Sequence, residues 1–299
     1  MHDQFTASGA SETVYSSCMM RALATTFAGL LGLSFGSFLN VCVSRWPEGE
    51  SVVQPRSHCR SCGRTLSWWE NLPLASWIAL KGRCSTCGAR ISWRYPLVEL
   101  AVGVLWAAAV WQTPRPAAEP MLLYAALARI AGSFIFFWLI VALAMLDWEQ
   151  LWLPDMLTLP GIAVGFLFTV GDGAFHGRAL GAALHALVAI VCMAAAMWMI
   201  RWTYRLIRRR EGLGLGDVKL MALLAAWLGA SGTLVAFALS VGLGSLAALV
   251  VLTRSAAKGN ASAWMTQKLP FGTFLCVGGA ISALFGRQIV TAYLHWAGF

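Results

Sequence analysis

The chain has 299 residues, of which 59% are hydrophobic and 12% are charged, and its formal net charge is +9. This charged fraction is about half the roughly 25% of soluble domains, which excludes an ordinary water-soluble enzyme, because so few charges cannot cover a globular surface. The basic residues gather in short stretches between apolar runs, where they report membrane topology and do not indicate nucleic-acid binding. The composition therefore predicts an all-α polytopic membrane protein.

Apolar runs of roughly 20 residues, the length needed to cross a hydrocarbon core of about 30 Å, recur along the chain. The first run is too long for the apolar core of a cleavable signal peptide, so we expect it to remain as the first span. A Gly-Ala-Ser-Gly break at residues 229–232 divides the longest run into two short helices. We expect about eight spans, at residues 22–43, 96–112, 121–146, 151–170, 179–200, two within 218–252, and 269–285.

Lys and Arg residues are concentrated in three segments between spans: residues 44–95 hold eight of them, residues 201–210 hold five and residues 254–268 hold three. The positive-inside rule places these segments in the cytoplasm, which with eight spans puts both termini outside. Residues 1–21 are then an extracytoplasmic tail. Residues 96–299 form the membrane domain that follows the cytoplasmic insert.

Four of the eight cysteines form two Cys-x-x-Cys pairs in this insert, Cys59 with Cys62 and Cys84 with Cys87. Each pair is followed by a glycine, and the spacing is close to a zinc-ribbon pattern, in which two such turns direct four thiolates at one ion. We expect a structural Zn²⁺, because a closed four-cysteine site has no open position for a substrate and so small a segment needs the metal to fold. The alternative is two redox-active or plain reduced thiol pairs, although a cytoplasmic position argues against a disulfide.

Two carboxylates lie at cytoplasmic ends of spans: Asp147 ends the third span, and Asp217 follows Gly-Leu-Gly-Leu-Gly at the start of the sixth. If they face one another, one keeps a proton while the other stays charged, and such a pair can activate a water and protonate a leaving amine, as in an aspartic protease. The plainer alternative makes Asp217 a helix N-cap and Asp147 an interfacial residue. Asp155, after Pro154, is expected to cap the fourth span.

Together these motifs resemble the type IV prepilin peptidases, whose second aspartate lies in a Gly-x-Gly-Asp signature shared with presenilin-like membrane proteases. The resemblance covers most of the chain, and the ordered set of motifs is far more specific than any single one. The matching segments are Gly36-Ser-Phe-Leu-Asn-Val41, Arg45-Trp-Pro47, Pro55-Arg-Ser-His-Cys59 with Cys62, Asn71-Leu-Pro73, Gly82-Arg-Cys84 with Cys87, Ile91-Ser-Trp-Arg-Tyr-Pro96, Val98-Glu-Leu100, Asp147, Leu153-Pro-Asp155, Gly214-Leu-Gly-Asp217-Val-Lys219 and Lys268-Leu-Pro-Phe-Gly272.

The resemblance implies a bifunctional enzyme of the bacterial inner membrane, with prepilins, pseudopilins and membrane lipid as partners and no nucleic acid. Such an enzyme cleaves the basic leader of type IV prepilins and type II secretion pseudopilins after glycine at the cytoplasmic face. It then methylates the new N-terminal residue with S-adenosylmethionine. The catalytic pair maps onto Asp147 and Asp217, and the zinc ligands map onto Cys59, Cys62, Cys84 and Cys87.

Two finer expectations concern residues beside these motifs. Thr273 stands where members of the family usually have a second proline after Pro-Phe-Gly, and we expect this departure to loosen the start of the last span without touching the acids. A basic leader needs acidic partners, and five glutamates are the candidates: Glu48, Glu50, Glu70, Glu99 and Glu149.

Two other functional classes stay open on the residues alone. A membrane thiol oxidoreductase would use the two Cys-x-x-Cys pairs as redox centres and the aspartates as proton relays. A proton-coupled transporter would carry protons on its intramembrane acids, and it predicts paired discontinuous helices and repeat symmetry. The sequence shows no internal repeat, and no glycine-rich turn after a strand marks a site for the methyl donor.

Overall fold

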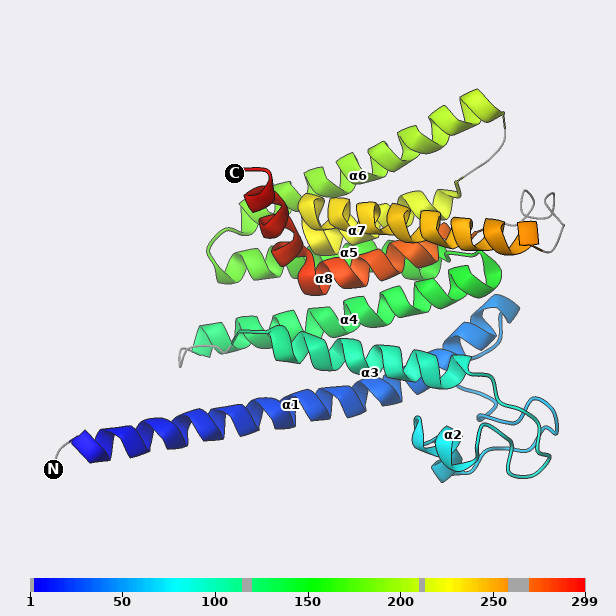
Figure 1. The fold of residues 1–299 in the computed structure, drawn as a ribbon, viewed down its shortest axis with the longest axis horizontal. Coiled ribbons are helices and arrows are strands. Elements are labelled where there is room, and N and C mark those ends of the chain that lie inside the picture. The colour runs from blue at the N-terminus through cyan, green and yellow to red at the C-terminus, as the bar shows by residue number, and fades with distance from the viewer. Residues whose placement is uncertain (1–2, 115–119, 210–212, 258–268, 299) are drawn as a thin grey trace. The chain divides into compact units, whose positions relative to one another are not determined.

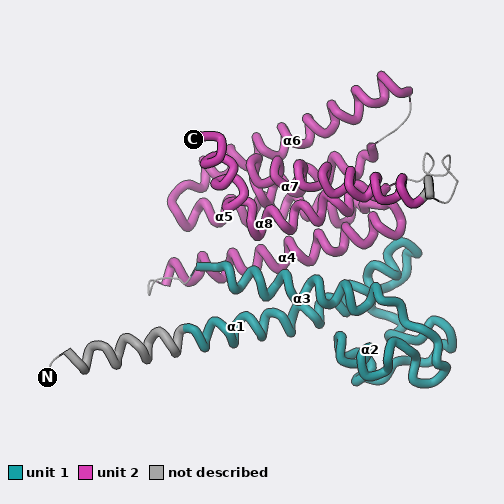
Figure 2. Tube along the Cα trace, in the orientation of Figure 1, with its two compact units in different colours: residues 1–115 teal, residues 116–299 magenta. Residues whose placement is uncertain are grey.

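The structure is a computed structural model that describes residues 3–114, 120–209, 213–257 and 269–298 (Figure 1). Three basic residues of the predicted cytoplasmic segments, Arg210, Lys258 and Lys268, lie outside these ranges. The chain divides into two compact units, residues 1–115 and residues 116–299, each with its own packing (Figure 2).

The first unit consists of two long helices and the cysteine insert that connects them. Glycines allow the helices to pack closely: a Cβ added at Gly36 would lie 2.7 Å from the Cα of Glu99. Small residues permit such an approach between membrane helices, where backbone contact replaces side-chain burial. The elements of this unit are α1 (Asp3–Arg45), the short helices η1 (Trp46–Glu48), η2 (Trp68–Asn71) and α2 (Ala75–Ala79), and α3 (Arg94–Gln112).

The second unit is a bundle of five helices, in which the indole of Trp227 packs between α7 and α5. The Nε1 of Trp227 donates a hydrogen bond to the carbonyl oxygen of Gly161 at 3.0 Å, and its ring stacks on Phe168 with 5.6 Å between centroids. Gly165 leaves room for this ring, because a Cβ there would lie 2.5 Å from Nε1. The helices are α4 (Pro120–Gln150), α5 (Asp155–Phe175), α6 (Ala179–Arg208), α7 (Leu215–Ala257) and α8 (Phe271–Trp296).

Helix α7 is interrupted at Gly229, inside the predicted break. This residue has a φ of 68°, a conformation that glycine adopts without the penalty other residues incur. Before the break, residues 215–228 run beside α5, where Leu223 and Trp227 fill the space left by two α5 glycines. The predicted division of this long apolar run into two helical parts is therefore confirmed.

After the break, α7 turns back and packs along α8. Ser240 donates a hydrogen bond to the carbonyl oxygen of Phe274 at 3.0 Å, and Ser282 donates one to that of Gly232 at 2.6 Å. Residue numbers rise along α8 as they fall along α7, so the two segments are antiparallel. The first half runs parallel to α8, since Asp217 acts on Cys276 and a Cβ at Gly279 would lie 2.7 Å from Leu224, so the two halves of α7 run in opposite directions.

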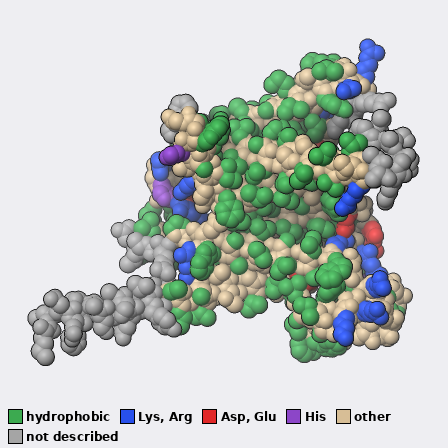
Figure 3. Space-filling model, in the orientation of Figure 1, with side chains coloured by type: hydrophobic (Ala, Val, Ile, Leu, Met, Phe, Trp, Pro, Cys, Tyr) green, Lys and Arg blue, Asp and Glu red, His purple; other side chains and the backbone are tan. Residues whose placement is uncertain are grey.

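Among the described residues, seven helices are long and apolar enough to cross a membrane, the first of them beginning at Cys18. Helix α7 counts once in this number although its halves run in opposite directions, which accounts for the difference from the eight spans expected. Several helices continue beyond the predicted spans; α6, for example, ends at Arg208. The all-α, multi-pass fold is confirmed, and hydrophobic side chains cover much of its visible surface (Figure 3).

The close approach of α7 and α8 predicts the effect of Gly278→Ala. A Cβ at this position would lie 2.3 Å from the carbonyl oxygen of Ala236, so we expect the variant to lose about 1–3 kcal/mol of stability. Thermal unfolding in detergent measures the loss as a lower midpoint. The control is Gly242→Ala, also in a helix, where a Cβ would have no neighbour within 4 Å. A Gly278→Ala midpoint no lower than that of the wild type would contradict the packing.

Candidate active site and metal centre

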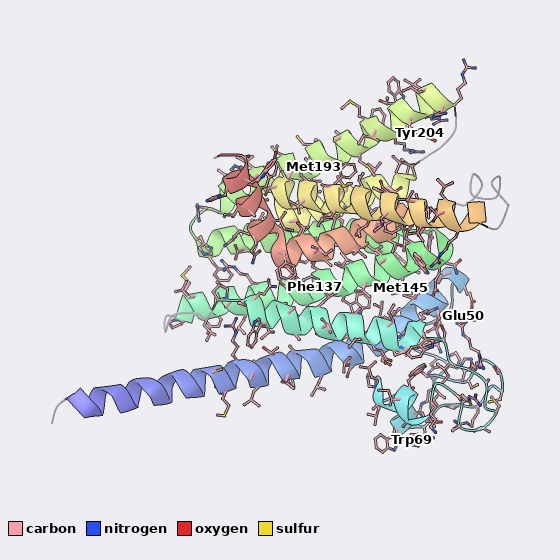
Figure 4. The ribbon with its side chains drawn as sticks, viewed as in Figure 1. Glu50, Trp69, Phe137, Met145, Met193 and Tyr204 are labelled. Atoms are coloured by element: carbon pink, nitrogen blue, oxygen red, sulfur yellow. The ribbon has the colours of Figure 1, made fainter. Side chains whose placement is uncertain are left out.

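Asp147 lies in the last turn of α4, two residues after Met145, which Figure 4 labels, and it is buried with 5% exposure. Its Oδ2 accepts a hydrogen bond from the backbone N–H of Thr273 at 2.6 Å, and the Thr273 hydroxyl oxygen lies 3.1 Å from the same atom. The expectation that Thr273 does not touch the acids is therefore wrong. The N–H is available because the first amides of a helix, here α8, have no partner inside that helix.

Gly272 allows the Asp147 carboxylate to reach the start of α8. A Cβ at Gly272 would lie 2.9 Å from Oδ2 of Asp147, inside the distance that real contacts allow. The sequence places Gly272 in a motif but does not indicate its contact with the acid. Its Pro-Phe-Gly context before the last span was the available signal, but the partner is 125 residues away in the chain.

Asp217 lies in the first turn of α7 and is also buried, with 8% exposure. Its Oδ2 accepts a hydrogen bond from the backbone N–H of Gly214 at 3.0 Å. Asp217 is the third residue of α7 and not the N-cap of the plainer alternative; its carboxylate reaches back to the residue before the helix, as the acid of a capping box does. The contact engages only one of the two carboxylate oxygens of Asp217.

Asp147 and Asp217 lie close enough for their charges to interact, and the buried Cys276 of α8 lies near both. Leu153, in the loop between α4 and α5, lies against Gly216 and Gly272. A Cβ at Gly216 would lie 2.9 Å from the Cβ of Leu153, and one at Gly272 would lie 3.1 Å from its Cδ1. Among the described residues, no hydrogen-bond donor reaches the Oδ1 atom of either aspartate.

Asp155 does not cap α5. The N-cap position is Pro154, with no side-chain hydrogen bond, and Asp155 is the first residue of the helix. Its carboxylate forms an ion pair with Lys219 of α7. The expected cap is therefore wrong, because the cation two residues after Asp217 provides a stronger partner than the backbone.

The four cysteines of the insert form one cluster. Their Sγ atoms all lie within 4.8 Å of one another, and those of Cys59 and Cys87 are 3.8 Å apart. Sulfurs at about 2.3 Å from a central zinc ion lie about 3.8 Å from one another in a regular tetrahedron. All four cysteines are free of disulfides. The cluster can therefore hold a metal ion.

Each Cys-x-x-Cys turn has the same backbone pattern. The N–H of Cys59 bonds the carbonyl of Arg64 at 2.9 Å, and the N–H of Cys84 bonds that of Ala89 at the same distance. The glycine that follows each pair has a φ of 70°. Glycine allows each of these tight turns to close, since a positive φ strains other residues.

The backbone of these turns favours thiolates, the form that binds metals. The N–H groups of Cys87 and Thr86 lower the pKa of Cys84 to about 6. The N–H of Ala89 lowers the pKa of Cys87, but burial and the neighbouring cysteines raise it to about 11. A divalent cation among the sulfurs would remove this repulsion.

Glu70 connects the two turns. Its Oε1 accepts hydrogen bonds from Nη2 of Arg64, in the first turn, and from the hydroxyl of Ser85, in the second, both at 2.6 Å. These bonds and one from the N–H of Ser67 lower the pKa of Glu70 to about 2. Glu99 is likewise occupied, since its Oε2 accepts the N–H of Leu74 at 2.8 Å. Both carboxylates are thus buried and already bonded, which argues against a role in meeting a basic leader.

Known proteins resemble this chain over nearly all of its length. Residues 30–113 match the family described as Bacterial Peptidase A24 N-terminal domain, and residues 134–249 match the Type IV leader peptidase family. Relatives named Prepilin leader peptidase/N-methyltransferase include those of Pseudomonas aeruginosa, 33% identical over 90% of this chain and 93% of that protein, and Pseudomonas putida, 33% identical over 92% and 95%. The relative from Burkholderia pseudomallei is 33% identical over 87% of this chain and 85% of its own.

No solved structure matches the chain at a significant level. The sequence relatives are sufficient to assign the family, because an identity of 33% extends over about nine tenths of the chain. The chain belongs to the prepilin leader peptidase/N-methyltransferase family.

Proposed function

We propose that this protein is a membrane aspartic endopeptidase that removes the basic leader of type IV prepilins and pseudopilins after glycine, and then methylates the new N-terminal residue. The observation that carries the proposal is the pair Asp147 and Asp217, buried at helix ends that meet in one site, in a chain of this family. The positive-inside rule favours the cytoplasmic face for this site, since the basic insert and the end of α6 lie on that side of the predicted topology.

Peptide hydrolysis needs one proton held between the two carboxylates. The ionised aspartate takes a proton from a water molecule as its oxygen attacks the scissile carbonyl carbon, while the protonated aspartate gives its proton to the carbonyl oxygen. Collapse of this tetrahedral intermediate breaks the C–N bond, and the leaving amine receives a proton from the dyad. The Oδ1 atoms of Asp147 and Asp217 accept and donate these protons. The apparent pKa values of the two carboxyl groups belong to the pair and not to either residue.

The substrate's position follows from the depth of the site. A prepilin has an apolar helix that lies in the membrane, so its leader junction reaches the interface at the level of the α4 and α7 ends. A peptide bond must leave its helix to be attacked, and polar groups at the interface lower the cost of doing so. Burial of the carboxylates lowers the effective dielectric constant around them, which strengthens their electrostatic interactions with the reacting bond.

The described residues include ligands for a zinc ion but no recognisable site for the methyl donor. Zinc fits the sulfur geometry, and Cys59, Cys62, Cys84 and Cys87 would hold it as a structural ion that stabilises the insert. S-adenosylmethionine supplies the methyl group transferred to the amine. The described residues contain no glycine-rich turn between a strand and a helix, so we assign none of them to the donor.

The dyad predicts that Asp147→Asn and Asp217→Asn each lower the rate of prepilin cleavage by more than about a thousandfold, because the two groups act as a unit. Purified protein in detergent is incubated with a prepilin, and mass spectrometry identifies the new N-terminus. Asp172→Asn is the matched control, since Asp172 pairs with Arg129 in the same unit, outside the site. Normal processing by either dyad variant would exclude the proposal.

The same assay tests methyl transfer. Addition of S-adenosylmethionine is expected to increase the mass of the processed N-terminus by one methyl group, and omission is expected to leave cleavage unchanged. Cleavage that never leads to the mass increase would leave a peptidase without the transferase activity.

The cysteine cluster predicts one zinc ion per chain, measured by elemental analysis of the purified protein. Cys84→Ser is expected to lose the metal and expose the insert to proteolysis, because three thiolates hold zinc less tightly than four. Cys192→Ser, at an exposed cysteine in α6, is the control. A metal-free wild type with four titratable thiols in the insert would instead favour the thiol oxidoreductase.

Glu70→Ala addresses the link between the two turns. Removing its carboxylate leaves Arg64 and Ser85 without their shared acceptor. We therefore expect the variant to bind as much zinc as the wild type but to lose it to a chelator several-fold faster. The measurement is the time course of zinc transfer to a coloured chelator. Identical time courses for variant and wild type would show that the carboxylate does not hold the turns together.

A further inference from the structure

Thr273 ties the start of α8 to the last turn of α4 through three close contacts. Its backbone N–H donates to Oδ2 of Asp147 at 2.6 Å, and its hydroxyl oxygen lies 3.1 Å from the same Oδ2 and 3.0 Å from the carbonyl oxygen of Ala144. A hydroxyl has one hydrogen, so it donates to one of these acceptors at a time. Both acceptors belong to the same turn of α4, and either bond fixes that turn to α8.

These contacts distinguish the two oxygens of the Asp147 carboxylate. Oδ2 is held by α8, whereas among the described residues no donor reaches Oδ1. A carboxylate bonded through one oxygen cannot rotate freely about its Cβ–Cγ bond without losing that bond. The bonded oxygen therefore sets the direction of the free one.

We propose that Thr273 is a positioning residue for the peptidase reaction: it holds Oδ2 of Asp147, so that Oδ1 is the oxygen that exchanges protons with water and substrate. The inference rests on the proposed peptidase function and deepens it. The N–H is the stronger contact because it is shorter and lies at a helix N-terminus, where the helix dipole adds to its attraction for a carboxylate.

The surroundings of Thr273 show that the site is built for this contact. Gly272 has no Cβ, which would otherwise lie 2.9 Å from Oδ2. Thr273 is the third residue of α8, so its N–H is not needed inside the helix. A proline is compatible with the first turn of a helix, yet it has neither the N–H nor the hydroxyl.

Three variants of Thr273 separate its two donors. Thr273→Val keeps the N–H and the shape but lacks the hydroxyl, so we expect kcat to fall by about 3- to 10-fold. Thr273→Pro introduces the residue usual in the family and lacks both donors; because this chain holds Oδ2 of Asp147 through those donors, we expect a fall of about 10- to 100-fold here, although members with proline must orient their aspartate through other contacts. Thr273→Ser keeps both and is expected to restore most of the rate. KM for the prepilin should stay within about twofold, since a residue that orients Asp147 does not bind the substrate.

The experiment measures kcat and KM of prepilin cleavage and the thermal midpoint for each variant. Thr291→Val is the control, because the Thr291 hydroxyl bonds only the carbonyl of Arg287 in the same helix, at 2.9 Å. The expected order of kcat is wild type and Ser, then Val, then Pro. Equal kcat for the wild type, Val and Pro variants would overturn the proposal, as would losses of kcat that follow the thermal midpoint alone.

The two proposals fail in different ways. A wild type that does not cleave prepilin, or an Asp147→Asn variant that does, removes the proposed function. A wild type that cleaves, an inactive Asp147→Asn variant and unaltered Thr273 variants remove only the positioning role.

Discussion

A carboxylate buried in a membrane protein needs hydrogen-bond donors, and the ends of helices are where a helical bundle has backbone donors to spare. Both aspartates of this protein are bonded by such amides: Asp147 by the first turn of α8, and Asp217 by the turn before α7. Neither bond uses a side-chain cation. The charge of Arg201 acts on Asp217, but among the described residues neither carboxylate forms an ion pair, which would favour the ionised form of both and oppose the sharing of a proton.

Glycine makes this arrangement sterically possible. Gly272 lets Asp147 approach α8, and Gly216 lets Leu153 pack beside the backbone of Asp217. Both glycines lie one residue before a key group, where a side chain would separate helices that must meet. These glycines therefore do more than make a loop flexible, because each sets how closely two segments approach one another beside an aspartate.

The sequence was sufficient for features encoded by local spacing. Two Cys-x-x-Cys pairs with their glycines predict the sulfur cluster, and the Gly-Ala-Ser-Gly segment predicts the interruption of α7, since each depends on a few adjacent residues. Contacts between distant segments were beyond it. Thr273 meets Asp147 across 126 positions of the chain, so local spacing does not indicate that Thr273 contacts an acid. Lys219 meets Asp155 across 64 positions, so local spacing favours a helix cap for Asp155 and not an ion pair. The sequence also does not reveal that Glu70 and Glu99 are buried, which argues against their contact with a leader.

The reversal of α7 at Gly229 gives the helix that carries Asp217 an unusual length. Residues 215–228 extend for about 21 Å at about 1.5 Å per residue, well below the roughly 30 Å of hydrocarbon that an ordinary span crosses. Such a segment fits only where the bilayer is thinned, or where one of its ends lies at a depth normally occupied by acyl chains. Hydrophobic mismatch is thereby built into the helix that carries Asp217. The acyl-chain length of the surrounding lipid becomes a determinant of how deep its carboxylate lies, a variable with no counterpart in a water-soluble protein.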